Sequence, residues 1–186
     1  MVLTFRCGVV CGSRHLGRGT LVSMALLTEI TLSGSTVVLR EAVREDVPAI
    51  VELLAVDQLG RTRDGVEGQE GLEPYRRAFT VLDADPAHLL VVADDGTGAV
   101  ATMQLSFLPG LARRGALRAQ LEAVRVHAAY RSQGLGTAMF EWAIEESRRR
   151  GAGLVQLTTD KSRGDAHRFY DRLGFVASHE GFKLYL

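Results

Sequence analysis

Short stretches of alternating apolar and polar residues are separated along the chain by longer stretches with helical spacing. The strand-like stretches are 36–40, 89–94, 99–107, 118–126, 154–158, 175–179 and 183–186. The stretches with helical spacing are 42–55, 73–82, 135–150 and 165–173. Asp95 and Gly96 stand between two apolar runs and predict a β-hairpin. Together these elements predict an α+β domain with a mixed, mostly antiparallel sheet.

Residues 121–150 join a strand, a glycine-containing turn and an amphipathic helix without interruption. The first amides of a helix have no partner within the helix, and the helix dipole is positive there. Glycines in the turn leave room for a phosphate to approach those amides. The turn therefore predicts a pyrophosphate-binding loop, which we call the phosphate loop. Its residues are Arg131, Ser132, Gln133, Gly134, Leu135, Gly136 and Thr137.

Two common phosphate-binding motifs do not fit this turn. A dinucleotide-binding fingerprint needs a third glycine at the position of Met139. A Walker loop needs a lysine within the turn, but the first lysine of the chain is Lys161. The order R-x-x-G-x-G resembles instead the acyl-CoA loop of the GNAT superfamily of N-acyltransferases. A second block, DAHRFYDRLGF at residues 165–175, resembles the A-x-x-[LF]-Y-x-x-x-G-F signature that follows this loop in the same superfamily. The resemblance extends over residues 36–186.

The resemblance implies a GNAT-like twisted sheet with helices on both faces. In such a sheet the parallel strands at 121–126 and 154–158 splay apart at the cofactor site. Acetyl-CoA is the implied co-substrate, and no metal is implied. The expected activity is transfer of the acetyl group to a primary amine of a small molecule or protein, by direct attack in a ternary complex. Homodimers are common in the family, so a homodimer is left open.

Three residues receive roles from the resemblance. The backbone amide of Val124 is expected to polarise the thioester carbonyl, and Val126 is expected to hold the pantetheine arm. Tyr170 stands where the superfamily places its general acid. A phenol with an ordinary pKa near ~10 is protonated at neutral pH and can donate a proton to a leaving thiolate. The alternative for Tyr170 is a ring that only packs on the sheet.

Glu122 is the candidate general base, because a carboxylate among apolar strand residues is costly unless it is used or paired. The alternative is a structural ion pair with Arg118 or Arg125. Gln120, on the same face by alternation, stands where some relatives carry a glutamate base. His127 is the second candidate for the base.

Two further features concern binding. Arg163 stands where relatives often carry asparagine, and an arginine there offers a cation to a CoA phosphate. In the superfamily the helix-loop-helix that contains the loop 58–74 covers the acceptor site. The acidic residues in and beside this loop either attract a cationic amine or are solvated charges with no specific role. They are Asp57, Asp64, Glu67, Glu70 and Glu73.

Composition narrows the classes of partner. The chain has 22 basic and 22 acidic residues, so its net charge gives no electrostatic basis for binding nucleic acid or an anionic membrane. No apolar run in the sequence is long enough to span a bilayer. Cys7 and Cys11 do not make a disulfide framework, and no Cys/His cluster resembles a zinc site. We expect a reducing, cytoplasmic location and, from the excess of arginine over lysine, a GC-rich bacterial gene.

Residues 1–35 are interpreted as an extension that precedes the domain at 36–186. The segment contains Arg6, Arg14 and Arg18 but no acid before Glu29. This composition is typical of an organelle transit peptide, and the alternative is an upstream start codon with Met24 as the true beginning. On either interpretation the segment is expected to be poorly ordered.

Two other functions are compatible with the phosphate loop. A catalytically silent acyl-CoA-binding regulatory module needs the loop but has no use for Tyr170 as an acid. An ATP-dependent enzyme would use the same turn, but the context of a magnesium ligand is missing from the sequence. The motifs do not identify the amine acceptor.

Overall fold

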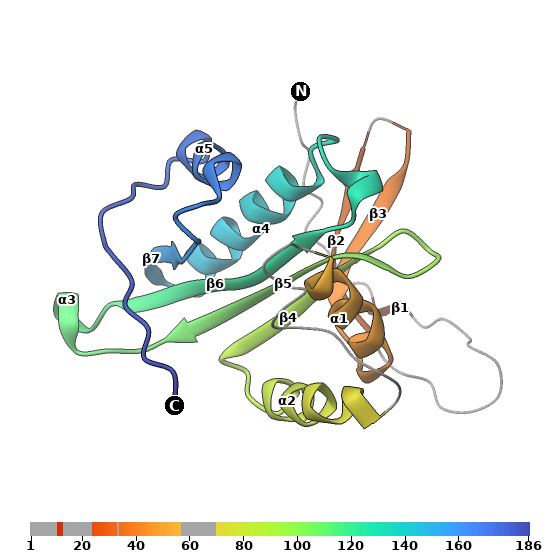
Figure 1. Ribbon diagram of the computed structural model, residues 1–186, viewed down its shortest axis with the longest axis horizontal. Helices are drawn as coiled ribbons and strands as arrows, with labels where there is room; N and C mark the ends of the chain where they lie inside the picture. The colour runs from red at the N-terminus through yellow and green to blue at the C-terminus, as the bar shows by residue number, and fades with distance from the viewer. Residues whose placement is uncertain (1–10, 13–23, 33, 57–69) are drawn as a thin grey trace.

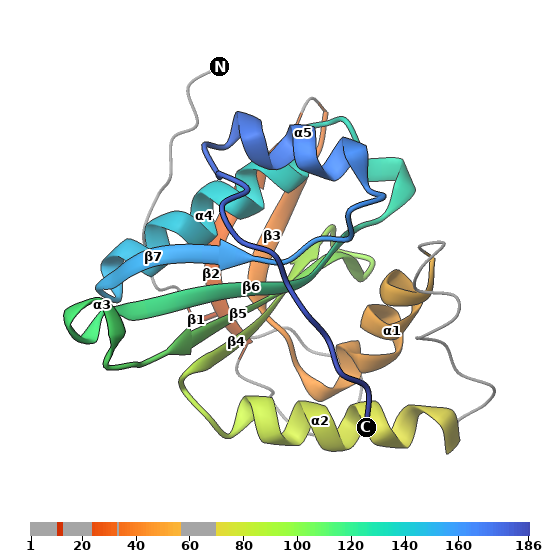
Figure 2. The ribbon, with the colours of Figure 1, turned by 60° about the vertical axis from the view of Figure 1, so that its left-hand side comes forward.

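The strands form one sheet with helices on both faces. A computed structural model describes residues 11–12, 24–32, 34–56 and 70–186. Within these ranges seven strands lie in the order β1-β2-β3-β4-β5-β6-β7, and only the β6–β7 pair is parallel. Helices α1 and α2 cover one face, and α4 and α5 cover the other (Figures 1 and 2). The predicted mixed, mostly antiparallel fold is therefore confirmed.

The element bounds agree with the predicted stretches over most of the described chain. The strands are β1 Cys11–Gly12, β2 Met24–Thr31, β3 Thr36–Glu41, β4 His88–Asp94, β5 Ala99–Leu108, β6 Leu117–Val126 and β7 Ala152–Leu157. The α-helices are α1 Val47–Ala55, α2 Glu73–Asp83, α3 Ala112–Gly115, α4 Leu135–Arg149 and α5 Gly164–Arg172. The short 3-10 turns are η1 Arg44–Asp46, η2 Glu70–Leu72 and η3 Ala128–Tyr130.

Two apolar clusters attach the helices to the sheet. The larger cluster lies between the sheet and α4, where Leu135, Met139 and Ala143 are fully buried at helical spacing. The smaller cluster packs α1 and α2 on the opposite face, through residues such as Ile50 and Phe79. Among the described residues, no helix is long and apolar enough to cross a bilayer.

The predicted start of the domain at residue 36 is too late. β2 pairs with β3 from Leu26↔Arg40 to Thr31↔Thr36, so residues 24–31 of the predicted extension belong to the sheet. Thr28 and Ile30 are buried while Glu29 between them is exposed, which is the alternation of a half-buried strand. Residues 1–10 and 13–23 of the predicted extension, and 57–69 before α2, lie outside the described residues.

Two predictions near the C-terminus are wrong. Residues 175–186 contain no strand, although strands were predicted at 175–179 and 183–186. Phe182 and Leu184 are 92% and 88% exposed, so the apolar residues of this alternating pattern do not pack on the sheet. Helix α5 begins at Gly164, close to the predicted start at residue 165, with Arg163 as its N-cap and Asp165 within its first turn.

A buried ion cluster fixes β3, η1 and the end of β4 to one another. Arg40 is 6% exposed and donates to both carboxylate oxygens of Asp46, at 2.6 and 2.9 Å. It also donates from Nε and Nη2 to Oδ2 of Asp94, at 3.1 and 2.8 Å. The cluster therefore holds the entry to α1 against the strand that leads into the β4–β5 turn.

Candidate functional site

A β-bulge in β6 separates it from β7. Thr102 pairs with Arg125 and Gln104 pairs with Glu122, so β6 carries an extra residue between these pairs. Ala123 has a φ of 55°, in the left-handed region that a residue with a side chain seldom adopts. The last pair between β6 and β7 is Leu121↔Leu157, just before the bulge. The term splay is used below for the place where the two strands separate. Its presence confirms the prediction that the parallel pair splays apart.

Val124 and Val126 lie on the part of β6 beyond the splay. The amide of His127 donates to the carbonyl of Val100 in β5, at 2.8 Å. The backbone N–H and C=O of a strand residue point to one side, and those of the next residue point to the other. Since His127 faces β5, the N–H and C=O of Val124 and of Val126 point away from β5, toward the splay. This orientation fits the predicted role of the Val124 amide. The carbonyl of Val126 accepts a hydrogen bond from Nε of Arg131, at 3.0 Å.

The phosphate loop has the conformation that an anion site requires. Gly134 is the N-cap of α4 and has a φ of 88°, which glycine adopts without strain. The first α4 bond is from the amide of Ala138 to the carbonyl of Gly134, at 3.0 Å. The amides of Leu135, Gly136 and Thr137 therefore have no backbone partner among the described residues.

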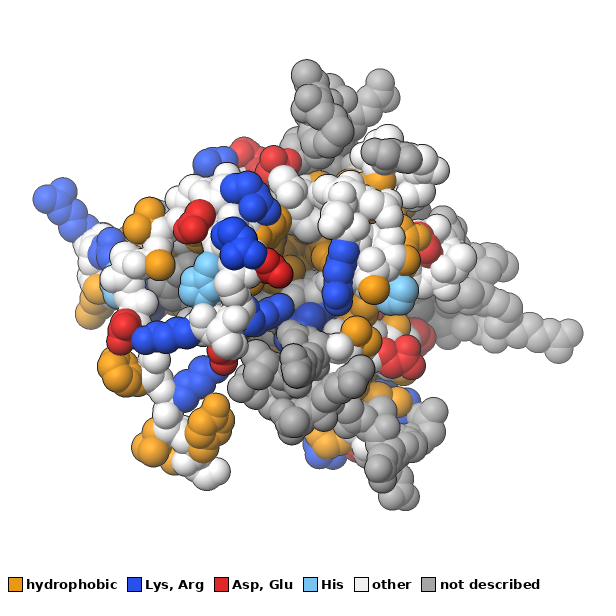
Figure 3. Space-filling model, turned by 45° about the horizontal axis from the view of Figure 1, so that its top comes forward, with side chains coloured by type: hydrophobic (Ala, Val, Ile, Leu, Met, Phe, Trp, Pro, Cys, Tyr) orange, Lys and Arg blue, Asp and Glu red, His pale blue; other side chains and the backbone are white. Residues whose placement is uncertain are grey.

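Gly136 leaves space at the tip of α4 next to the splay. A Cβ added there would lie 3.8 Å from Phe169 and 3.9 Å from Val126, which is ordinary contact. Packing within the protein thus does not require glycine at this position, whereas close approach of a phosphate to the amides does. The loop therefore fits a pyrophosphate. Figure 3 shows the molecule with the top of Figure 1 turned toward the viewer. On this face, Lys and Arg side chains lie around a hollow with apolar walls.

An additional tether holds the segment before the phosphate loop. The hydroxyl of Tyr130 in η3 donates to Oδ2 of Asp95 in the β4–β5 turn, at 2.6 Å. Hydrogen bonds from Thr97 and Tyr130 lower the pKa of Asp95 to about 2, so the carboxylate stays charged at any pH near neutrality. The sequence gives no signal for this role of Tyr130 other than its position directly before Arg131.

Tyr170 lies on α5 with its ring in an aromatic cluster. The ring centroid is 5.7 Å from that of Phe140 and 6.1 Å from that of Phe175. Burial raises the pKa of the Tyr170 phenol, and the charges of Arg163 and Arg125 reduce this shift. The raised pKa keeps the phenol protonated at neutral pH, as a general acid must be.

The electrostatic neighbours of the Tyr170 phenol come from both strands of the splay. Glu122 and Arg125 belong to β6, and Thr159 and Arg163 follow β7. Glu122 therefore lies near enough to Tyr170 for its charge to raise the pKa of the phenol. Packing of the Tyr170 ring does not exclude a role for its hydroxyl, because the ring contacts the core while the hydroxyl is influenced by these charged groups.

The side chain of Glu122 is exposed, and a neighbouring glutamine binds its carboxylate. Oε1 of Glu122 accepts a hydrogen bond from Nε2 of Gln120, at 2.8 Å, which confirms that the two side chains share a face. His127, the second candidate for the base, is the N-cap of η3 and accepts from the amide of Ala129 through Nδ1. A contact of Arg163 with a CoA phosphate stays a prediction.

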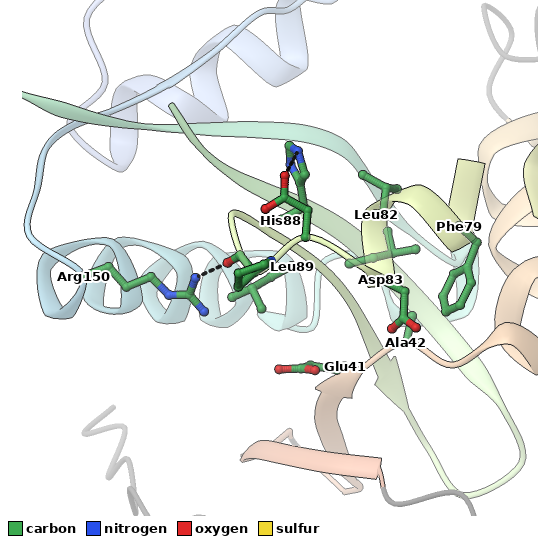
Figure 4. A pocket seen from close by; sticks show the side chains of 11 residues that line it. Glu41, Ala42, Phe79, Leu82, Asp83, His88, Leu89 and Arg150 are labelled. Atoms are coloured by element: carbon green, nitrogen blue, oxygen red, sulfur yellow. Dashed lines mark hydrogen bonds and ion pairs between the residues drawn. The ribbon is translucent and has the colours of Figure 1, made fainter. Parts of the chain in front are cut away.

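A separate pocket of about 250 Å³ lies beside the end of α2 and the start of β4 (Figure 4). Its lining includes Glu41, Phe79, Asp83 and His88. Arg150 also lines it and donates from Nη1 to the carbonyl of Pro86, at 2.9 Å. None of the predicted site residues lines this pocket. Among the described residues, no group of three or more His, Cys, Asp or Glu side chains is arranged to hold a metal ion.

Comparison with known proteins points to one family. The model of the acetyltransferase (GNAT) family matches residues 49–175. A crystal structure named a transcriptional regulator from Bacillus halodurans C-125 is 45% identical, with a TM-score of 0.76, and the match covers 81% of this chain and 99% of that one. A putative acetyltransferase from Agrobacterium tumefaciens str. C58 is 30% identical, with a TM-score of 0.69 and coverage of 80% and 99%.

A shorter match involves a curated relative. The aminoalkylphosphonate N-acetyltransferase of Salmonella typhimurium (strain LT2) is 48% identical over 52 residues, which are 28% of this chain and 34% of that protein. The chain thus matches about a third of the length of the curated relatives.

Proposed function

Because the chain belongs to the acetyltransferase (GNAT) family, we propose that it transfers an acetyl group from acetyl-CoA to a primary amine. Acetyl-CoA supplies an activated thioester and a pyrophosphate for recognition. The observation that carries the proposal is the splay after Leu121 and Leu157, with the amides of the phosphate loop on one side and the Tyr170 phenol beside it.

Each part of this site has a separate task. The amides of Leu135, Gly136 and Thr137 would bind the pyrophosphate, assisted by the charge of Arg131. The backbone N–H groups of Val124 and Val126 face the splay, where the N–H of Val124 can stabilise negative charge on the carbonyl oxygen of the thioester. No metal is needed for these tasks.

Proton transfer completes the reaction. Glu122 accepts a proton from the acceptor ammonium, so that the neutral amine can attack the thioester carbon. The C–S bond then breaks, and Tyr170 donates its proton to the sulfur. The nitrogen that has attacked releases its second proton to solvent, and the phenol recovers its proton from solvent. The products are an N-acetylated amine and free CoA.

The acceptor to test first carries an anionic group beside its amine. The charges of Arg163 and Arg125 oppose the rise that burial causes in the pKa of Tyr170, so two cationic groups act on the phenol that would serve as the acid. A relative named an aminoalkylphosphonate N-acetyltransferase supports the same choice. An aminoalkylphosphonate combines the amine that Glu122 would deprotonate with an anion for the arginines.

Release of CoA thiol with a panel of amines tests the proposal. The panel contains an aminoalkylphosphonate, the alkylamine that lacks the phosphonate, a polyamine, an amino acid and a peptide. We expect release that depends on the acceptor for at least one amine, with the acetylated product seen by mass spectrometry. The relative named a transcriptional regulator favours one alternative, a silent acyl-CoA-binding module. Tight binding of CoA without acceptor-dependent release would support this module and contradict the proposal.

A further inference from the structure

Three polar side chains form a hydrogen-bonded chain across β6 and β7 just before the splay. Gln156 of β7 donates from Nε2 to Oε1 of Gln120, at 2.6 Å. Gln120 donates from Nε2 to Oε1 of Glu122, at 2.8 Å. Gln120 and Gln156 are register partners, one pair before the last pair of the two strands. The chain of hydrogen bonds thus begins on one strand and ends at the candidate base on the other.

The chemistry of Glu122 fixes the direction of this chain. An ionised carboxylate only accepts hydrogen bonds, so the NH₂ end of the Gln120 amide must face Glu122. The oxygen of Gln120 then faces β7, where only a donor stabilises it. Gln156 supplies that donor through its own NH₂ group. Each glutamine therefore has one favourable orientation, and the orientation of Gln120 depends on Gln156.

Glu122 needs such a restraint because its side chain is exposed. An exposed glutamate samples several rotamers, and only some of them direct a carboxylate oxygen toward an incoming ammonium group. The bond from Gln120 occupies Oε1 and limits these rotamers. Oε2 is then left to accept the proton.

We propose that Gln120, oriented by Gln156, is a positioning residue for Glu122 in the deprotonation of the acceptor amine. This inference rests on the proposed function. Neither glutamine contacts the reacting atoms, so both act only through the carboxylate that they restrain.

The test measures kcat at saturating acetyl-CoA with an accepted amine, in two backgrounds. In the wild-type background Gln120→Leu is expected to lower kcat about tenfold, the effect of one hydrogen bond to a charged group, and Gln156→Leu about threefold. In the Glu122→Gln background, neither substitution is expected to lower the residual rate further. A residue that only supports the fold would lower the rate by the same factor in both backgrounds.

Gln104→Leu is the matched control. Gln104 lies on the same face, opposite Glu122 in β5, but donates to Ser106 instead, at 3.0 Å. Its effect is expected to be equal in the two backgrounds. Should Gln120→Leu fail to fold, Gln156→Leu serves alone, because its effect must also vanish without Glu122.

Two results would overturn the inference while leaving acetyl transfer intact. One is equal effects of Gln120→Leu or Gln156→Leu in both backgrounds. The other is a Glu122→Gln enzyme that keeps the wild-type kcat and pH profile, because the carboxylate would then not be the base. Absence of acetylation of every amine, by contrast, contradicts the proposed function itself.

Discussion

Replacement of Tyr170 with phenylalanine is expected to lower kcat about a hundredfold, while the affinity for acetyl-CoA changes little. The substitution removes only the hydroxyl, so the ring contacts with Phe140 and Phe175 persist and the fold is preserved. Without the phenol, the thiolate must take its proton from water. Steady-state kinetics give kcat, and calorimetric titration of the same protein gives the affinity.

The pH dependence of the wild-type enzyme gives a second measure of Tyr170. The acid works in its protonated form, and burial raises the pKa of the phenol. The rate is therefore expected to persist through neutral pH and to fall only above about 10, the ordinary pKa of tyrosine. The Tyr170→Phe enzyme is expected to lack this alkaline fall. Tyr185→Phe, at a residue that is 80% exposed, is the control. Unchanged turnover of Tyr170→Phe with a good acceptor would contradict the role.

Replacement of Arg40 with methionine is expected to reduce the free energy of unfolding by about 3–5 kcal/mol. The change leaves the carboxylates of Asp46 and Asp94 without their shared cation, and both side chains are largely buried, at 10% and 19% exposure. Urea denaturation measures the loss. The cluster ends at Asp94, next to the Asp95 that accepts from Tyr130, so the same corner supports the phosphate loop.

Arg148→Met is the control for Arg40→Met. Its ion pair with Glu145 has exposed side chains, at 69% and 72%, and such a pair contributes less than about 1 kcal/mol. Similar losses for Arg40→Met and Arg148→Met would show that the buried cluster is not a principal support of the fold.

The sequence predicts the core of the site because two signals coincide there. Apolar periodicity identifies β6 and α4, and the glycines at 134 and 136 identify the turn between them. The motif around Tyr170 identifies the helix that carries the phenol. These features depend on neighbouring residues along the chain, so the sequence alone reveals them.

Features that depend on pairing between distant strands are not visible in the sequence. Ala123 has no local mark of a bulge, because its positive φ follows from the register of β6 on β5. The bond from Gln156 to Gln120 likewise depends on the register of β6 and β7. The sequence does not predict β2 because its alternating residues follow a segment whose composition is typical of a targeting peptide. The stretches 175–179 and 183–186 have the alternation of a strand but pair with no strand in the described part of the chain.

Calorimetric titration of acetyl-CoA into the full-length protein tests the central claim, that the free amides of the phosphate loop bind a pyrophosphate. The matched variant is Gly136→Asp. A side chain fits there, with the nearest atom 3.8 Å from its Cβ, and an acid in the first turn stabilises a helix. The variant should therefore fold while its charge repels phosphate.

We predict saturable binding by the wild-type protein and an affinity at least about tenfold weaker for Gly136→Asp, from charge repulsion and loss of space at the helix tip. Absence of heat and of competition by CoA with the folded wild-type protein, or equal affinity of the two proteins, would contradict the account.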